Sequence, residues 1–202
     1  MKLHEARRRT MIPVPPWGAL ALEWRRERDA VRITRVILPG RASARAWERT
    51  VTKTSPAPAA PELKPVIAGL RAAMRGAAAE FPLGSLDGSC GSDFQRRILQ
   101  RLQRVGRGRV VTYRQLAEDI GRPGAARAVA RALAANPFPL ILPCHRVVRS
   151  DGSLGGYQGG RRLKRTLLEL EIASLAGPGP GVGASRGVAD KRPGAGRQKK
   201  LF

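Results

Sequence analysis

The sequence has few of the residues that build metal sites, disulfide frameworks and membrane spans. Its 202 residues include two cysteines and two histidines, and only 4% are aromatic. Cys90 and Cys144 lie far apart and show no metal-ligand spacing with the histidines, so we expect neither a metal nor a cofactor. No segment approaches the roughly 20 apolar residues of a membrane span, and the N-terminus lacks the features of a signal peptide. We therefore expect a cytoplasmic chain, in whose reducing compartment a cysteine is more often buried or reactive than bridged.

Acidic residues are also scarce. The chain carries 15 Asp and Glu against 38 Lys and Arg, which gives a formal net charge of +23. Such a basic chain favours a polyphosphate partner, because neutralising phosphates releases counterions without any recognition of sequence. The alternative is that arginine-rich coding simply inflates the number of basic residues. We expect nucleic acid as the partner, and a monomer that associates with the nucleoid.

Composition divides the chain into four segments. We expect a flexible N-terminus, a small α/β domain, a mainly helical domain and a disordered basic tail rich in glycine and proline. Their bounds are residues 1–12, 13–85, 86–173 and 174–202.

The α/β domain shows both strand and helix periodicity. Residues 17–24 and 31–38 alternate apolar and polar side chains around a charged connection, which predicts an antiparallel hairpin. The Pro- and Ala-rich stretch 50–61 predicts a loop, and apolar residues at helical spacing predict an amphipathic helix over 62–76.

The next segment predicts several short helices. A helix with one basic face is expected after Ser92. Thr112 with Gln115 three residues later predicts a helix start through a capping box. Gly-Arg-Pro-Gly at 121–124 ends that helix, and an alanine-rich helix follows over 125–135. Two short helices joined by a glycine-containing turn are typical of a helix-turn-helix, although helical hairpins also occur in proteins that do not bind DNA.

Cys144 stands in the sequence Pro-Cys-His-Arg-Val-Val, at the end of a buried-looking run that predicts a strand. A lone cysteine at a strand end is more often a small buried hydrophobe than a catalyst. Here a histidine and an arginine follow at once, and a nearby cation favours the nucleophilic thiolate. A glycine-rich loop comes next, able to lie over a planar ligand, and a last helix is expected over 161–173. These features favour a reactive Cys144.

This block resembles the active site of the O6-alkylguanine-DNA alkyltransferases (methylated-DNA–protein-cysteine methyltransferases). Leu-Pro-Cys-His-Arg-Val-Val, with Ala-Ala-Arg-Ala-Val and Asn-Pro before it and Gly-Gly-Tyr-Gln-Gly-Gly after it, resembles the family without a gap from Phe94 to Glu171. The N-terminal part agrees only in layout. The resemblance implies a ribonuclease-H-like small α/β domain, followed by a mainly α, winged-helix-like domain that carries the helix-turn-helix.

The resemblance also implies a reaction and its residues. The alkyl group of O6-alkylguanine in DNA, with O4-alkylthymine as a further candidate, would pass irreversibly to Cys144, so that each molecule acts once. His145 would take the thiol proton through a water molecule, and Glu171 would orient the imidazole. The water is needed because neighbours on an extended strand point to opposite faces. Asn136 would form the hinge between the recognition helix and the active-site strand.

The target atom lies inside a duplex, so the base would have to leave the stack. By resemblance, Arg127 would fill the gap, and Tyr113 would crowd the target's 3′ phosphate and donate to O6. Ala128 and Arg131 lie on the same helix as Arg127, and binding would use the minor groove with little sequence preference.

Five residues are expected to wall the substrate pocket: Tyr157, Gln158, Gly159, Val147 and Pro139. Gln158 departs from the family, whose members commonly have a small residue there, and it puts the accepted range of alkyl groups in doubt. Some relatives hold a structural zinc in the N-terminal domain, for which this chain lacks the ligands. Cys90 lies outside the motif and is expected to be structural.

The chain ends in Gln198-Lys-Lys-Leu201-Phe202. This resembles the Gln-x-x-Leu-Phe peptide with which bacterial repair proteins bind the sliding clamp, since it presents two apolar side chains to a hydrophobic pocket. The alternative is a basic tail that merely holds DNA.

Two other functions compete with alkyl transfer. A lesion-binding relative without chemistry would lack the cysteine, so Cys144 argues against it. A helix-turn-helix regulator would need no nucleophile beside a glycine-rich pocket, and no dimerisation segment or sensor domain is evident.

Overall fold

The computed structural model describes residues 7–28, 30–39, 55–88 and 91–176. Its N-terminal half is a four-stranded sheet in the order β3-β2-β1-β4. β2 (Ala19–Glu27) and β3 (Ala30–Ile37) form the predicted antiparallel hairpin. β1 (Arg8–Pro13) pairs antiparallel with β2, and the short β4 (Ser55–Pro56) pairs parallel with β1.

The expectation of a flexible segment over residues 1–12 is wrong for the residues that form β1. Arg9, Thr10 and Ile12 are buried, and β1 covers the edge of β2 that the hairpin leaves open. An unpaired strand edge exposes a row of backbone donors and acceptors, so pairing with β1 satisfies them.

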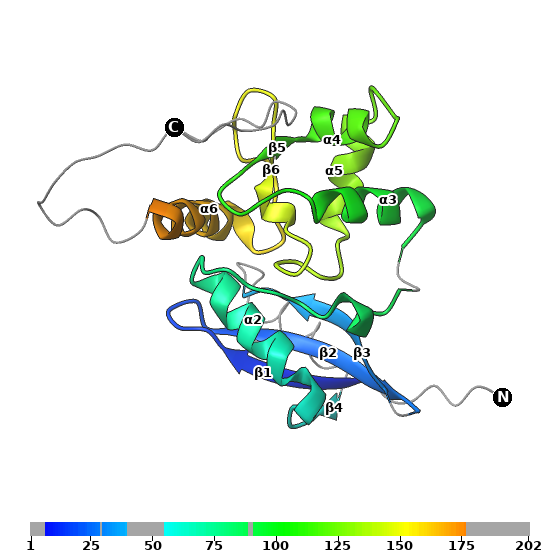
Figure 1. Ribbon diagram of the computed structural model, residues 1–202, viewed down its shortest axis with the longest axis vertical. Coiled ribbons are helices and arrows are strands. Elements are labelled where there is room, and N and C mark those ends of the chain that lie inside the picture. Colours follow the sequence, from blue (N-terminus) through cyan, green and yellow to red (C-terminus); the bar gives the residue numbers. More distant parts are fainter. Residues whose placement is uncertain (1–6, 29, 40–54, 89–90, 177–202) are drawn as a thin grey trace, which may run out of the picture.

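Helix α2 (Lys64–Met74) confirms the predicted amphipathic helix, and a short 3₁₀ helix, η1 (Pro61–Leu63), precedes it. Figure 1 shows α2 lying across one face of the sheet. Val66, Leu70 and Met74 are buried along this side of the helix. A second 3₁₀ turn, η2 (Leu83–Ser85), leads towards the C-terminal half.

The C-terminal half is mainly helical. Its elements are α3 (Asp93–Leu102), β5 (Val111–Thr112), α4 (Tyr113–Asp119), α5 (Ala126–Ala134), the 3₁₀ helix η3 (Cys144–Arg146), β6 (Val147–Val148) and α6 (Gly160–Ala176). The predicted capping box is confirmed: Thr112 accepts from the backbone N–H of Gln115, whose side chain accepts from the backbone N–H of Thr112. α3, α4 and α5 pack together, and β5 pairs parallel with β6.

The segment before Cys144 is buried but is not the predicted strand. Residues 138–142 form only a single bridge, between Pro139 and Leu142, and Cys144 begins a 3₁₀ turn rather than ending a strand. Prolines at 137, 139 and 143 explain this, because proline has no N–H to donate to a sheet.

The last helix is longer than predicted and reaches Ala176. Ser174, expected to start the tail, bonds instead to the carbonyl of Gly76, 2.7 Å away. The remaining tail, including Gln198, Leu201 and Phe202, lies outside the described residues, as does Cys90.

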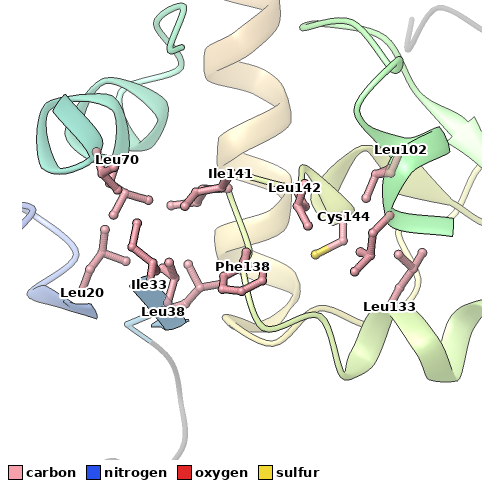
Figure 2. Packing of buried hydrophobic residues seen from close by; sticks show 14 of the residues in the cluster. Leu20, Ile33, Leu38, Leu70, Leu102, Leu133, Phe138, Ile141, Leu142 and Cys144 are labelled. Carbon is pink, nitrogen blue, oxygen red and sulfur yellow. The ribbon is translucent and has the colours of Figure 1, made fainter. Parts of the chain in front are cut away.

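One hydrophobic core joins the two halves. Leu20, Ile33 and Leu70 from the sheet and α2 belong to the same buried cluster as Leu133 and Cys144, and Figure 2 shows Phe138 and Ile141 lying between them. The backbone adds a direct link, since the N–H of Val36 in β3 donates to the carbonyl of Pro137 over 2.8 Å. The sheet therefore supports the segment that leads to Cys144. Within the described part of the chain, no helix is long and apolar enough to cross a membrane.

Candidate active site

Cys144 lies at the floor of a pocket of about 320 Å³ and is only 5% exposed. α5 forms one wall and the glycine-rich loop forms the other. We call this space the thiol pocket; its lining is Tyr113, Ala130, Leu133, Ala134, Cys144, Gly156, Tyr157 and Gln158. A nucleophile at the base of a largely apolar pocket meets only a ligand that enters the pocket.

Asn136 holds the nucleophile. Its Nδ2 donates to the carbonyl of Leu142 at 2.9 Å and to Sγ of Cys144 at 3.3 Å. Its Oδ1 accepts from the backbone N–H of Phe138 at 3.0 Å. The side chain is 2% exposed, and a buried amide with every group bonded fixes the turn between α5 and η3.

Burial raises the pKa of the Cys144 thiol. The hydrogen bond from Asn136 and the positive charge of Lys164 both oppose that rise without cancelling it. The thiol is therefore neutral at pH 7, and a base must take its proton as Sγ attacks.

His145, the residue after Cys144, forms a buried pair with Glu171. Nε2 of His145 lies 2.9 Å from Oε1 of Glu171. Burial lowers the pKa of His145, so the ring is neutral, and Nε2 carries the hydrogen that the carboxylate accepts. Nδ1 is then the ring nitrogen that can take a proton. Within the described part of the chain, neither Nδ1 nor the buried hydroxyl of Tyr157 has a hydrogen-bond partner.

The helical half of the chain is similar to proteins of known function. Residues 93–173 match the DNA-binding domain of 6-O-methylguanine DNA methyltransferase. A methylated-DNA–protein-cysteine methyltransferase from Methanothermobacter thermautotrophicus is 46% identical over 116 residues, which cover 57% of this chain and 64% of that protein. Its counterpart from Mycobacterium leprae is 50% identical over 82 residues, which cover 41% of this chain and 50% of that protein. The chain thus spans 50% to 64% of the length of these curated relatives.

A solved structure extends the similarity to the sheet. OGT from Mycobacterium tuberculosis in complex with DNA is 35% identical with a TM-score of 0.64, and the match covers 83% of this chain and 92% of that one. The chain belongs to the O6-methylguanine-DNA methyltransferase family.

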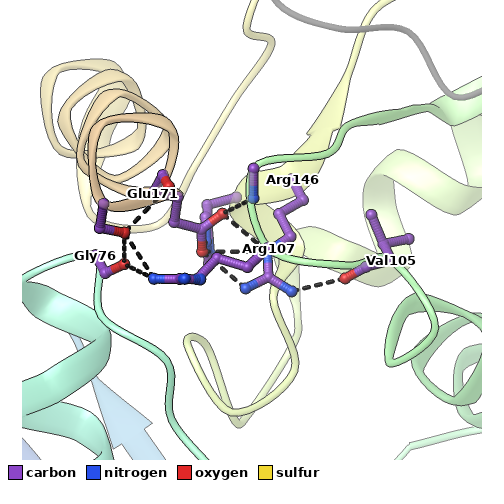
Figure 3. Close-up of polar contacts among 8 residues, drawn as sticks. Gly76, Val105, Arg107, Arg146 and Glu171 are labelled. Atoms are coloured by element: carbon purple, nitrogen blue, oxygen red, sulfur yellow. Dashed lines mark hydrogen bonds and ion pairs between the residues drawn. The ribbon is translucent and has the colours of Figure 1, made fainter. Parts of the chain in front are cut away.

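In this member of the O6-methylguanine-DNA methyltransferase family, Arg146 acts on Glu171 rather than on the thiol. Its Nη2 lies 2.8 Å from Oε1, its Nε lies 3.1 Å from Oε2, and its Nη1 donates to the carbonyl of Val105 at 2.6 Å (Figure 3). The backbone N–H of Gly108 donates to Oε2 at 3.0 Å. Burial raises the pKa of Glu171, but hydrogen bonds from His145 and Arg146 outweigh it and lower the pKa to about 2. Glu171 is therefore a fixed carboxylate.

Lys164 is a site residue that the sequence analysis missed. It is fully buried on α6, and its Nζ donates to the carbonyls of Val147, Leu154 and Gly156. Burial lowers its pKa to about 8, and its charge favours the Cys144 thiolate. Its place on the apolar side of α6, beside the buried Leu163 and Leu167, was the available signal.

The structure brings only some of the expected pocket residues together. Tyr157 and Gln158 line the thiol pocket, but Gly159, Val147 and Pro139 do not. Val147 pairs in β6, Gly159 packs against α6, and Pro139 is buried in the proline-rich segment. All three positions are buried outside the thiol pocket.

The side chain of Gln158 lies along the end of α5. Its Nε2 donates to the carbonyls of Ala134 at 3.0 Å and Asn136 at 2.7 Å. The carbonyls at a helix C-terminus lack intrahelical partners, so Gln158 both lines the pocket and satisfies one of them, that of Ala134, together with the Asn136 carbonyl just beyond the helix.

The residues expected to contact DNA lie on α4 and α5. Tyr113 begins α4 and lines the thiol pocket. Arg127 and Arg131 are exposed on α5, Ala128 is half-buried there, and none of these three lines the thiol pocket. Among the described residues, no group of three or more His, Cys, Asp and Glu side chains could hold a metal ion.

Proposed function

We propose that this chain repairs O6-alkylguanine in DNA by transferring the alkyl group to Sγ of Cys144. The observation that carries the proposal is a thiol at the floor of a pocket, hydrogen-bonded by Asn136, with the neutral base His145 beside it in the sequence and oriented by Glu171. Membership of the O6-methylguanine-DNA methyltransferase family supports it.

The chemistry is a single displacement. The thiol proton passes through a water molecule to Nδ1 of His145, Sγ bonds to the alkyl carbon, and the bond from that carbon to guanine O6 breaks. The electron pair stays on the guanine, which takes up one proton and so balances the one that the thiol gave up. Burial raises the pKa of Tyr113, which keeps its hydroxyl protonated and able to donate to O6. The thioether product is stable, so each molecule reacts once.

Base flipping explains how the lesion reaches the thiol. A base stacked in a duplex cannot enter the thiol pocket, so the nucleotide must rotate out. α4 and α5 would act as the helix-turn-helix, with α5 in the minor groove and Arg127 filling the vacated stack. Their connection supports this role, because it turns sharply at Gly121 and Gly124, both at positive φ. Ala128 and Arg131 would face the backbone beside Arg127.

A labelled duplex tests the proposal. The protein is incubated with DNA that carries a radiolabelled methyl group on O6 of one guanine. We expect one methyl group per protein molecule to move to the protein, and Cys144→Ser to abolish transfer while DNA binding remains. Label that stays on the DNA with the wild-type protein would overturn the proposal. A duplex with O4-methylthymine tests the second substrate in the same way.

The remaining expectations rest on the sequence alone: a ribonuclease-H-like N-terminal domain, a monomer, a place in the cytoplasm and clamp binding through Gln198, Leu201 and Phe202. Deleting the last five residues should abolish capture of the sliding clamp in a pull-down. Unchanged capture would remove the clamp from the proposal.

A further inference from the structure

A second hollow of about 420 Å³ adjoins the thiol pocket, and its lining includes three arginines. We call it the arginine hollow; its lining is Tyr113, Arg114, Ala126, Arg127, Ala130, Arg149, Ser150, Gly155 and Gly156. No acidic residue belongs to this lining, and Arg114, Arg127 and Arg149 are all exposed. Like charges around one hollow repel each other unless an anion lies between them.

The short sheet of the C-terminal half brings these arginines together. β5 and β6 run parallel, with Thr112 opposite Val148. The next residues, Tyr113 and Arg149, therefore leave the sheet at the same end. Arg114 follows at the start of α4, so residues far apart in the sequence meet at one rim.

The three guanidinium groups are available for a ligand. Among the described residues, none of the three forms an ion pair or a side-chain hydrogen bond, whereas Arg101 and Arg146 are paired with carboxylates. Asp151 interacts electrostatically with Arg149, but its carboxylate already accepts a hydrogen bond from the backbone N–H of Ser153.

The two hollows share a wall. Tyr113, Ala130 and Gly156 line both, with Cys144 on one side and the arginines on the other. A nucleotide has the same layout, because its base and its phosphates lie on opposite sides of the sugar. A base that reaches Cys144 therefore leaves its phosphates at the arginine hollow.

We propose that the arginine hollow binds the backbone phosphates that flank the flipped nucleotide, with Arg114 and Arg149 as phosphate ligands. The proposal rests on the proposed function and adds two residues to the DNA contacts already assigned. The alternative is that both arginines are solvated surface charges.

Salt dependence of binding tests the contacts. Affinity for a lesion-containing duplex is measured across salt concentrations in a Cys144→Ser background, in which no transfer occurs. Arg114→Gln and Arg149→Gln should each reduce the slope of log affinity against log salt by about one. Arg149→Lys should keep the wild-type slope, since it keeps the charge. Arg71→Gln, an exposed arginine on α2 in the other half, is the matched control with no expected change.

Neutral phosphates locate the contact on the lesion nucleotide. Methylphosphonates on both sides of the lesion remove the two charges that the hollow would bind. They should weaken DNA binding by the Cys144→Ser protein but not by the same protein with Arg114→Gln and Arg149→Gln. The double variant has already lost the contacts that the neutral phosphates would remove. Methylphosphonates several nucleotides away from the lesion should weaken DNA binding by both proteins to the same extent.

Two results would overturn the phosphate site: unchanged salt slopes in the glutamine variants, or equal losses from lesion-flanking methylphosphonates in both proteins. Alkyl transfer by the wild-type protein is measured separately with the labelled duplex. Failure there removes the proposed function and leaves the binding result standing, so the two failures are distinguishable.

Discussion

Nδ2 of Asn136 lies 3.3 Å from Sγ of Cys144, and both groups are buried. The bond ties the last residue before the proline-rich segment to the nucleophile eight positions later. Asn136 lies just after Ala135, the C-cap of α5, so a shift of that helix would also move the hydrogen-bond donor of the thiol.

Asn136→Ala should unfold more easily and react more slowly. The substitution leaves the buried Phe138 N–H without a partner and the Leu142 carbonyl with only the Cys144 N–H, which costs about 2 kcal/mol. The pKa of Cys144 should rise further, because a donor to sulfur is lost. Urea unfolding measures the loss of stability. The pH dependence of Cys144 modification by a small alkylating reagent measures the rise in the thiol pKa. An unchanged thiol pKa would show that the 3.3 Å contact does not tune the nucleophile.

The transfer rate should fall at acid pH with a midpoint below 6.5. Burial lowers the pKa of His145, and the ring accepts the thiol proton only while it is neutral. Glu171, with its pKa near 2, stays ionised throughout this range and contributes nothing to the decline. Single-turnover rates between pH 5 and 8 measure the midpoint. His145→Gln should remove the acid decline and slow transfer by about 10²-fold or more.

The same shift affects stability. A histidine whose folded pKa is lowered binds fewer protons in the folded state, so the free energy of unfolding should fall as the pH drops below 6.5. Denaturant unfolding of the wild type and His145→Gln at several pH values isolates this contribution.

For the pH dependence of the transfer rate, a midpoint at or above pH 6.5 would contradict the assignment of His145 as the buried base.

Gly155→Ala should impair transfer more than Gly152→Ala. Both glycines have positive φ, +65° and +84°, so either substitution costs about 1 kcal/mol in backbone strain. At Gly155 the new methyl group would also lie 3.0 Å from the hydroxyl oxygen of Tyr113, whereas nothing lies within 4 Å at Gly152. Tm and single-turnover rates compare the two. Equal rates would show that the loop does not position Tyr113.

Gln158→Gly should widen the range of accepted alkyl groups. It removes a side chain from the lining of the thiol pocket and two hydrogen bonds to the end of α5, which cost about 1 kcal/mol. Gln95→Ala is the matched control, because Gln95 also donates to two carbonyls at the end of α5, those of Ala132 and its C-cap Ala135, without lining the pocket. The ratio of benzyl to methyl transfer should rise in the first variant only.

Local signals predicted the elements around the site but not the backbone beside the thiol. Thr112 and Gln115 form the expected capping box because both partners lie within one helical turn. The strand expected before Cys144 is absent, because apolar composition indicates burial and not the conformation in which residues are buried. The prolines in that stretch carried the missing information.

The sequence by itself determined which groups are chemically available: Cys144 next to His145, a glutamate 26 positions further on, and a basic helical region. Only the tertiary structure decided which of these groups pair with each other and how their pKa values shift. Arg146 pairs with Glu171 rather than with the thiol, and the cation that favours the thiolate is the buried Lys164. Hydrogen bonds within one helical turn can be predicted from residue order. Burial and charge pairing depend on which distant segments pack together, and these set the pKa values on which the reaction depends.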